Sequence, residues 1–170
     1  MNDVIEVIMT TDTNQLKVHK KRQGSQLFVR LSGHLNEFSK LEVEVEPGID
    51  AYCFDLEELD QINSVGVQVW AKMMTSIPSG KQMEVQRCGL RFVNNMNLYA
   101  NFMGFHSVTV GSFYAPYYCE ACDDSRRILL TPEEVRATGS LVPPKKNCSG
   151  CNKLLSFDGV PAKYFMFMKA

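Results

Sequence analysis

Residues 51–77 read AYCFDLEELDQINSVGVQVWAKMMTSI, and they contain a strand pattern followed by a helix pattern. The first six residues form a short apolar run with aromatic members, which is typical of a buried strand. The polar residues 57–64 predict a loop. From residue 64 to residue 77 apolar side chains recur at spacings of three and four, which predicts an amphipathic helix with Trp70 on its buried face.

The chain before this stretch predicts a β-hairpin. Residues 16–18 alternate between apolar and polar, residues 23–25 supply a turn, and residues 27–31 return as a strand. Residues 38–45 predict a short helix or an edge segment. One further apolar alternation, within residues 4–8, predicts a strand or an ordered N-terminal arm.

The chain after the helix repeats the alternation of strand and helix. Residues 83–88 and 108–110 have strand patterns, and residues 92–102 have helical spacing with Gly104 as a left-handed residue beyond the helix. A hairpin followed by alternating helices and strands predicts an α/β fold, in which helices pack on one face of a mixed sheet.

The composition changes after residue 113, where we place a domain boundary. Residues 1–113, with a core at about 16–113, form the predicted α/β domain, and residues 114–170 form a second, smaller module. Residues 114–118 (YAPYY) are interpreted as the join between them. The second module contains two Cys-x-x-Cys pairs, made by Cys119, Cys122, Cys148 and Cys151.

These two cysteine pairs predict one metal site. Two intervening residues let both sulfurs of a pair reach the same ion at about 2.3 Å. Four thiolates fill a tetrahedral shell, so we expect one structural Zn²⁺ ion. A rubredoxin-like iron site, a redox pair and ordinary thiols are the alternatives. A module of this size also needs a metal to stabilise it. Strands at residues 127–130 and 154–157, with a loop at 141–144, would complete a zinc ribbon.

The overall composition limits the classes of function. The chain has 170 residues, of which 45% are hydrophobic and 22% charged, and its formal net charge is −1. We therefore expect a packed core and no broad positive field to attract nucleic acid or an anionic membrane. No run reaches the roughly 18 apolar residues that span a bilayer, and the N-terminus carries acidic rather than basic residues. These features predict a cytoplasmic protein.

Three motifs in the first domain together resemble the STAS domain of anti-sigma-factor antagonists. Residues 28–35 (FVRLSGHL) resemble the family's strand that ends in L-S-G-x-L, and residues 54–56 (FDL) resemble its D-L strand. Residues 62–67 (INSVGV) resemble its D-S-S-G turn, which opens a helix, with Asn63 in place of the aspartate and Val65 in place of the second serine. The resemblance implies a STAS-like mixed sheet for this domain.

The same resemblance implies a non-enzymatic role in bacterial signalling. In the family, the first serine of the turn accepts a phosphate from a partner kinase, so the matching Ser64 is the implied phosphoacceptor. The implied contact surface for a serine kinase or an anti-sigma protein consists of Asn63, Ser64, Val65 and Gly66. A helix N-terminus accommodates a phosphate well, but Asn63 or Ser64 could also serve only as the helix cap.

No catalytic motif accompanies these features, and we expect no enzymatic activity. His19, His34 and His106 lie apart in the sequence, and no nucleophile motif is near them. Cys53 and Cys88 each lie alone in an apolar strand pattern, so we expect them to be core thiols.

Two groups of charged residues have alternative interpretations. Glu57, Glu58 and Asp60 predict either a solvated acidic loop or a patch that faces a partner. A nucleic-acid-binding adaptor is the alternative function, in which basic residues of the ribbon line a phosphate path. Those residues are Arg126, Arg127, Lys145, Lys146 and Lys153. The net charge of −1 does not favour this alternative.

Overall fold

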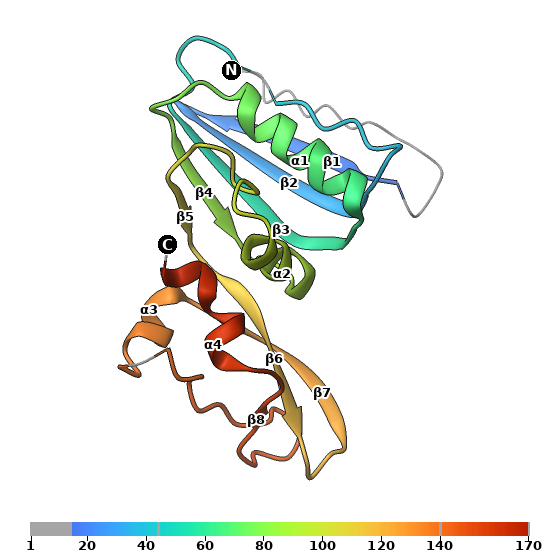
Figure 1. The fold of residues 1–170 in the computed structure, drawn as a ribbon, viewed down its shortest axis with the longest axis vertical. Coiled ribbons are helices and arrows are strands. Elements are labelled where there is room, and N and C mark those ends of the chain that lie inside the picture. The colour runs from blue at the N-terminus through green and yellow to red at the C-terminus, as the bar shows by residue number, and fades with distance from the viewer. Residues whose placement is uncertain (1–14, 44, 140, 170) are drawn as a thin grey trace.

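The computed structural model describes residues 15–43, 45–139 and 141–169, and it contains two β-sheets that follow one another along the molecule (Figure 1). The larger sheet has five strands in the order β1-β2-β3-β4-β5, and the smaller sheet has three in the order β7-β6-β8. The alternation predicted as an N-terminal arm, residues 4–8, lies outside the described residues.

The larger sheet is mixed, as the sequence predicts. β1 (Lys17–Gln23) and β2 (Gln26–Leu35) form the predicted antiparallel hairpin, and Gly24 in its turn has the left-handed φ of 60° that such turns require. The other three strands extend the sheet in parallel from β2, and they are β3 (Ala51–Ile62), β4 (Gln82–Gln86) and β5 (Val108–Val110).

Two helices cover one face of this sheet (Figure 1): α1 (Ser64–Ser76) and α2 (Leu90–Leu98). Trp70 of α1 is fully buried, as predicted. Its ring centroid lies 5.3 Å from that of Phe54 on β3, 5.0 Å from Phe92 on α2 and 5.9 Å from Phe102. These edge-to-face and stacked contacts between aromatic rings connect both helices to the sheet.

β3 is longer than the sequence predicts. Its second half occupies the segment 57–64 that the sequence predicts as a loop, up to Ile62. The register against β2 shifts twice here, so β3 carries two residues more than its partner over the same length. Because such bulges reset the alternation of side chains, Leu56 and Leu59 are both buried although they are three residues apart. The second half of β3 therefore lacks the regular apolar alternation by which a strand is predicted from the sequence.

Two further expectations for this domain are wrong. Residues 38–43 form neither a helix nor a strand. α2 ends at Leu98, so the predicted helix over 92–102 stops early, and the chain continues through turns in which Gly104 has a φ of 65°. Phe102 nevertheless reaches the core from these turns. The apolar spacing over residues 92–102 therefore indicates which side chains are buried, but only its first part indicates a helix.

The smaller sheet contains a strand at residues 114–118, where the sequence predicts a join. β6 (Phe113–Cys119) pairs with β7 (Asp124–Leu130) along its whole length and with the short β8 (Ser156–Phe157) only through Tyr117 and Tyr118. Pro116 lies where the pairing of β6 with β8 ends, and its carbonyl oxygen accepts the Asp158 N–H at 3.0 Å. Proline is tolerated there because the ladder does not continue past this position.

Three short helices complete the C-terminal part: α3 (Pro132–Arg136), α4 (Pro161–Tyr164) and the 3₁₀ helix η1 (Met166–Lys169). Thr131 caps α3 in a capping box with Glu134. Within the part of the chain that is described, no helix combines the length and apolarity needed to cross a membrane.

The two sheets share a continuous core. Phe113, the last residue of the first predicted domain, is the first residue of β6, and the Tyr114 N–H donates to the Cys88 carbonyl at 2.9 Å. The ring of Phe113 contacts those of Phe165 and Phe167 near the C-terminus. Asn97 of α2 bonds through its side chain to backbone groups of this C-terminal segment, at 2.8 and 2.7 Å. The C-terminal segment thus packs between the two parts of the molecule.

Candidate metal centre and docking face

The four cysteines of the second module come together in one cluster. The Sγ atoms of Cys119, Cys122, Cys148 and Cys151 all lie within 4.8 Å of one another. The Sγ atoms of Cys119 and Cys151 are 3.5 Å apart, and those of Cys122 and Cys148 are 3.9 Å apart. A tetrahedral site with Zn–S bonds of about 2.3 Å has sulfurs about 3.8 Å apart, whereas a disulfide needs about 2.05 Å. The cluster therefore has the dimensions of a metal site.

The two cysteine pairs share one backbone feature. The residue that follows each pair, Asp123 after the first and Asn152 after the second, has a left-handed conformation with φ of 52° and 58°. Aspartate and asparagine adopt this conformation more readily than other non-glycine residues. The sequence analysis overlooked these two residues, although Asp and Asn directly after each Cys-x-x-Cys pair were visible signals of a repeated turn.

The pKa values of the Cys122 and Cys148 thiols are shifted by their neighbours. Backbone N–H groups of Cys151 and Gly150 lower the pKa of the Cys148 thiol to about 6. The pKa of Cys122 is raised to about 12, first by its contact with Cys151 and then by the other two thiols. A divalent cation among the sulfurs would favour the thiolate form of all four, so metal binding should release protons.

The donor set fits one soft metal ion. Thiolates select zinc, copper(I) or iron over magnesium and calcium, and four of them leave no open coordination position. Cys119 ends β6 and is buried with Cys148, whereas Cys122 and Cys151 are exposed. A metal held by all four would therefore join the end of β6 to the second cysteine pair, Cys148 and Cys151. Its role would be structural.

The start of α1 is capped by Asn63 and not by Ser64. The Asn63 Oδ1 accepts a hydrogen bond from the Gly66 N–H at 2.8 Å, and its Nδ2 donates to the Glu37 carboxylate at 2.7 Å. The Glu37 backbone N–H and this Asn63 amide lower the pKa of the Glu37 carboxyl. The Ser64 side chain is exposed and has no hydrogen-bond partner among the described residues.

The four residues of the implied contact surface have different environments. Asn63, Ser64 and Val65 are exposed, and the side chain of Val65 is 39% exposed. Gly66 is buried, and a Cβ atom there would collide with the Leu35 carbonyl at the end of β2. Gly66 therefore lets α1 approach the sheet closely.

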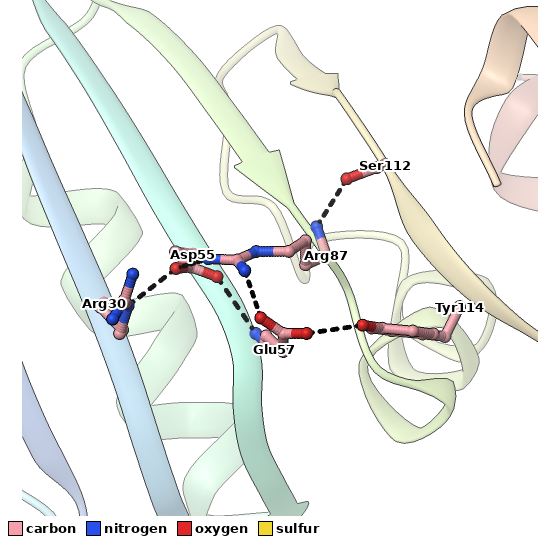
Figure 2. A network of polar contacts seen from close by, with 6 residues as sticks. All are labelled: Arg30, Asp55, Glu57, Arg87, Ser112 and Tyr114. Carbon is pink, nitrogen blue, oxygen red and sulfur yellow. Dashed lines mark hydrogen bonds and ion pairs between the residues drawn. The ribbon is translucent and has the colours of Figure 1, made fainter. Parts of the chain in front are cut away.

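A polar network that the sequence analysis missed lies at the junction of the two sheets (Figure 2). Arg87, which follows β4, forms ion pairs with Asp55 and Glu57 of β3. The Arg30 Nε of β2 also donates to Asp55, at 2.9 Å. Asp55 is only 6% exposed, and its buried carboxylate is paired with these two arginines. Arg87 has a positive φ of 53°, which is uncommon for this residue type.

The network also reaches the smaller sheet (Figure 2). The Tyr114 hydroxyl of β6 donates to Glu57 at 2.7 Å, and the Arg87 N–H donates to the Ser112 hydroxyl at 2.9 Å. The guanidinium of Arg127 lies 5.4 Å from the centroid of the Tyr114 ring. These contacts connect β3, β4 and β6, so the network fixes how the two sheets meet.

The acidic cluster is divided between two environments. Glu57 belongs to this network, whereas Glu58 and Asp60 are exposed. All three lie on β3 and not on a loop.

The basic residues of the second module are largely engaged with other groups. Arg126 forms an ion pair with Asp124, Lys146 forms one with Glu134, and Arg127 lies over an aromatic ring. Lys145 and Lys153 are exposed.

The remaining predicted residues have structural surroundings. Cys53 and Cys88 are buried, and burial raises the pKa of Cys53 to about 11 and raises that of Cys88 further. The His106 Nε2 lies 2.9 Å from the Met74 carbonyl oxygen at the end of α1, and His19 and His34 are partly buried on the β1–β2 hairpin.

No protein-family model matches this sequence, and no curated protein matches it significantly.

Proposed function

We propose that this chain is a non-enzymatic signalling module, in which a STAS-like domain of the anti-sigma-factor-antagonist kind is joined to a zinc ribbon. It would bind a regulatory serine kinase or an anti-sigma protein. The order of the elements and the mixed sheet with helices on one face support the first part of this proposal. Four cysteines at tetrahedral separations support the second, with one structural Zn²⁺ as the metal.

The observation that carries the proposal is the free hydroxyl of Ser64. Because Asn63 provides the cap, Ser64 is exposed at the first position of α1 and makes no side-chain hydrogen bond to any described residue. The backbone N–H groups of a first helical turn and the helix dipole favour a phosphate there. A partner kinase could therefore modify Ser64 without removing the cap.

Two exposed apolar residues are sequence neighbours of the residues at this helix start. Phe38 is 78% exposed and follows Glu37, which is bonded to Asn63, and Val65 is the next residue along α1. We define the Ser64 face as Glu37, Phe38, Asn63, Ser64 and Val65. Exposed aromatic and apolar side chains next to polar ones are typical of protein-binding surfaces. A phosphate adds about −1.5 to −2 charges, which would oppose burial of Phe38 and Val65 against a partner.

Affinity purification from the source cell, with mass spectrometry of retained proteins, tests this function. We expect wild type and Ser64→Ala to retain a kinase-fold or anti-sigma protein in high salt, and Ser64→Glu and Phe38→Ala to lose it. Ser79→Glu is the matched control, because it places the same charge on an exposed serine beyond the other end of α1. Thermal melts establish that each variant is folded.

Two results would contradict the proposal. Equal retention of that protein by wild type and Ser64→Glu would show that this face does not regulate binding. Salt-sensitive retention of nucleic acid by the wild type, without a protein partner, would favour the adaptor function of the ribbon instead.

A further inference from the structure

A positively charged side chain stands directly beside the cysteine cluster. Gly150 lies between Cys148 and Cys151, the second cysteine pair. A Cβ atom at Gly150 would lie 3.8 Å from Arg126 Nη2. The same atom would lie 3.8 Å from Cys148 Sγ and 3.9 Å from Cys122 Sγ. The guanidinium and two of the four sulfurs therefore border one small space, which the missing side chain of Gly150 leaves open.

The guanidinium of Arg126 has unused hydrogen-bonding capacity. Its Nη2 lies 3.0 Å from Asp124 Oδ2. Its Nε is buried and has no hydrogen-bond partner within the part of the chain that is described. A buried donor without a partner is unfavourable unless it interacts with a nearby charge.

The loaded cluster would supply such a charge. Four thiolates around one divalent cation leave an excess of two negative charges, because each sulfur is singly charged. A cation next to the sulfurs offsets this excess, and groups that surround a metal site in this way influence how firmly the ligands hold the metal.

We propose that Arg126 is a positioning residue of the metal centre, whose guanidinium offsets the negative charge of the sulfurs of Cys122 and Cys148 and slows loss of the metal. This inference rests on the proposed metal site. It assigns Arg126 to the ribbon's own metal and not to a phosphate path. Asp124 pairs with the guanidinium and, as an anion, competes with the sulfurs for its positive charge.

The test measures the rate of zinc transfer from the intact protein to a coloured chelator. We expect Arg126→Gln to release zinc about 10- to 100-fold faster than wild type, the range found when groups that support metal ligands are removed. Arg126→Lys, which keeps the charge, should restore part of the difference. Arg127→Gln is the matched control, because Arg127 is the next residue on β7 and contacts Tyr114 instead.

A second variant separates the electrostatic role from a merely structural one. If the Asp124–Arg126 ion pair served only to stabilise the hairpin, Asp124→Asn would accelerate release as much as Arg126→Gln. If Arg126 acts on the sulfurs, Asp124→Asn should leave release unchanged or slower, because the guanidinium loses a competing anion.

The outcomes also distinguish this inference from the proposed function. Wild-type protein that carries no metal would refute the metal site itself. Zinc-loaded wild type with an equally slow Arg126→Gln variant would refute only the role of Arg126, as would equal acceleration by Asp124→Asn. The cobalt(II)-substituted protein gives an independent readout, because the sulfur-to-cobalt charge-transfer band should shift in Arg126→Gln and not in Arg127→Gln.

Discussion

At the scale of single residues, two neighbouring polar side chains at the start of α1 have different tasks. The Asn63 side chain accepts the Gly66 N–H of the first helical turn, whereas the Ser64 hydroxyl makes no hydrogen bond within the described part of the chain. This division frees the serine for a partner or for modification. It also separates two effects that are usually combined when the residue at a helix start is mutated, namely loss of the cap and loss of the exposed hydroxyl.

Asn63→Ala should therefore destabilise the protein by about 0.5–2 kcal/mol, the usual value of a helix cap. Ser64→Ala should change the free energy of unfolding by less, since its side chain satisfies no backbone group. Denaturant unfolding of both variants measures these differences. If Ser64→Ala were as destabilising as Asn63→Ala, the Ser64 hydroxyl would be contributing to the helix cap in solution. This result would contradict the account.

At the scale of secondary-structure elements, the Arg87 network holds three strands of the two sheets together. Asp55 and Glu57 come from β3, Arg87 follows β4, and Tyr114 belongs to β6. Because Asp55 is almost completely buried, removal of one arginine leaves its carboxylate only partly compensated. The junction is therefore sensitive to a single substitution.

Arg87→Ala should lower the free energy of unfolding by about 1.5–3 kcal/mol, the range for hydrogen bonds to charged groups. The lower end is expected because Arg30 continues to pair with Asp55 and because Arg87 is partly exposed. Arg91→Ala on α2 is the control, since that side chain is exposed. Indistinguishable unfolding curves for the two variants would contradict the role of the network.

Local patterns predicted most of these elements but not their extents. The spacing of apolar residues identifies α1, the β1–β2 hairpin and the short parallel strands, because their apolar residues recur with the period of a helix or a strand. β3 was underestimated because two register shifts break its alternation. β6 was read as a join because Pro116 usually excludes a central strand, although the buried residues of FYAPYYC alternate throughout.

The candidate sites show the same limit. The cysteine cluster was predictable because spacing within each pair determines which sulfurs can share an ion. The partnership of Asp55, Arg87 and Tyr114 was not, since it depends on how strands far apart in the sequence meet in space. In the sequence Arg126 is one of several basic residues, and its position beside the sulfurs follows only from the pairing of β6 with β7.

At the scale of the whole molecule, the two modules behave as parts of one structure. Cys88, which lies just after β4, forms a parallel β-bridge with Phe113, the first residue of β6. The C-terminal segment packs its Phe165 and Phe167 rings against Phe113. The metal ligands at the end of β6 are therefore connected to the core of the larger sheet. A metal in this cluster would therefore stabilise the larger sheet as well as the smaller sheet beside it.

The metal content of the protein, purified without added metal, tests this account most directly. The four sulfurs at tetrahedral separations predict about one zinc ion per chain, because one Cys₄ site binds one ion. Elemental analysis of protein shown to be folded by circular dichroism supplies the measurement. About one equivalent of zinc would agree with the account. A well-folded protein that contains neither zinc nor iron would contradict it.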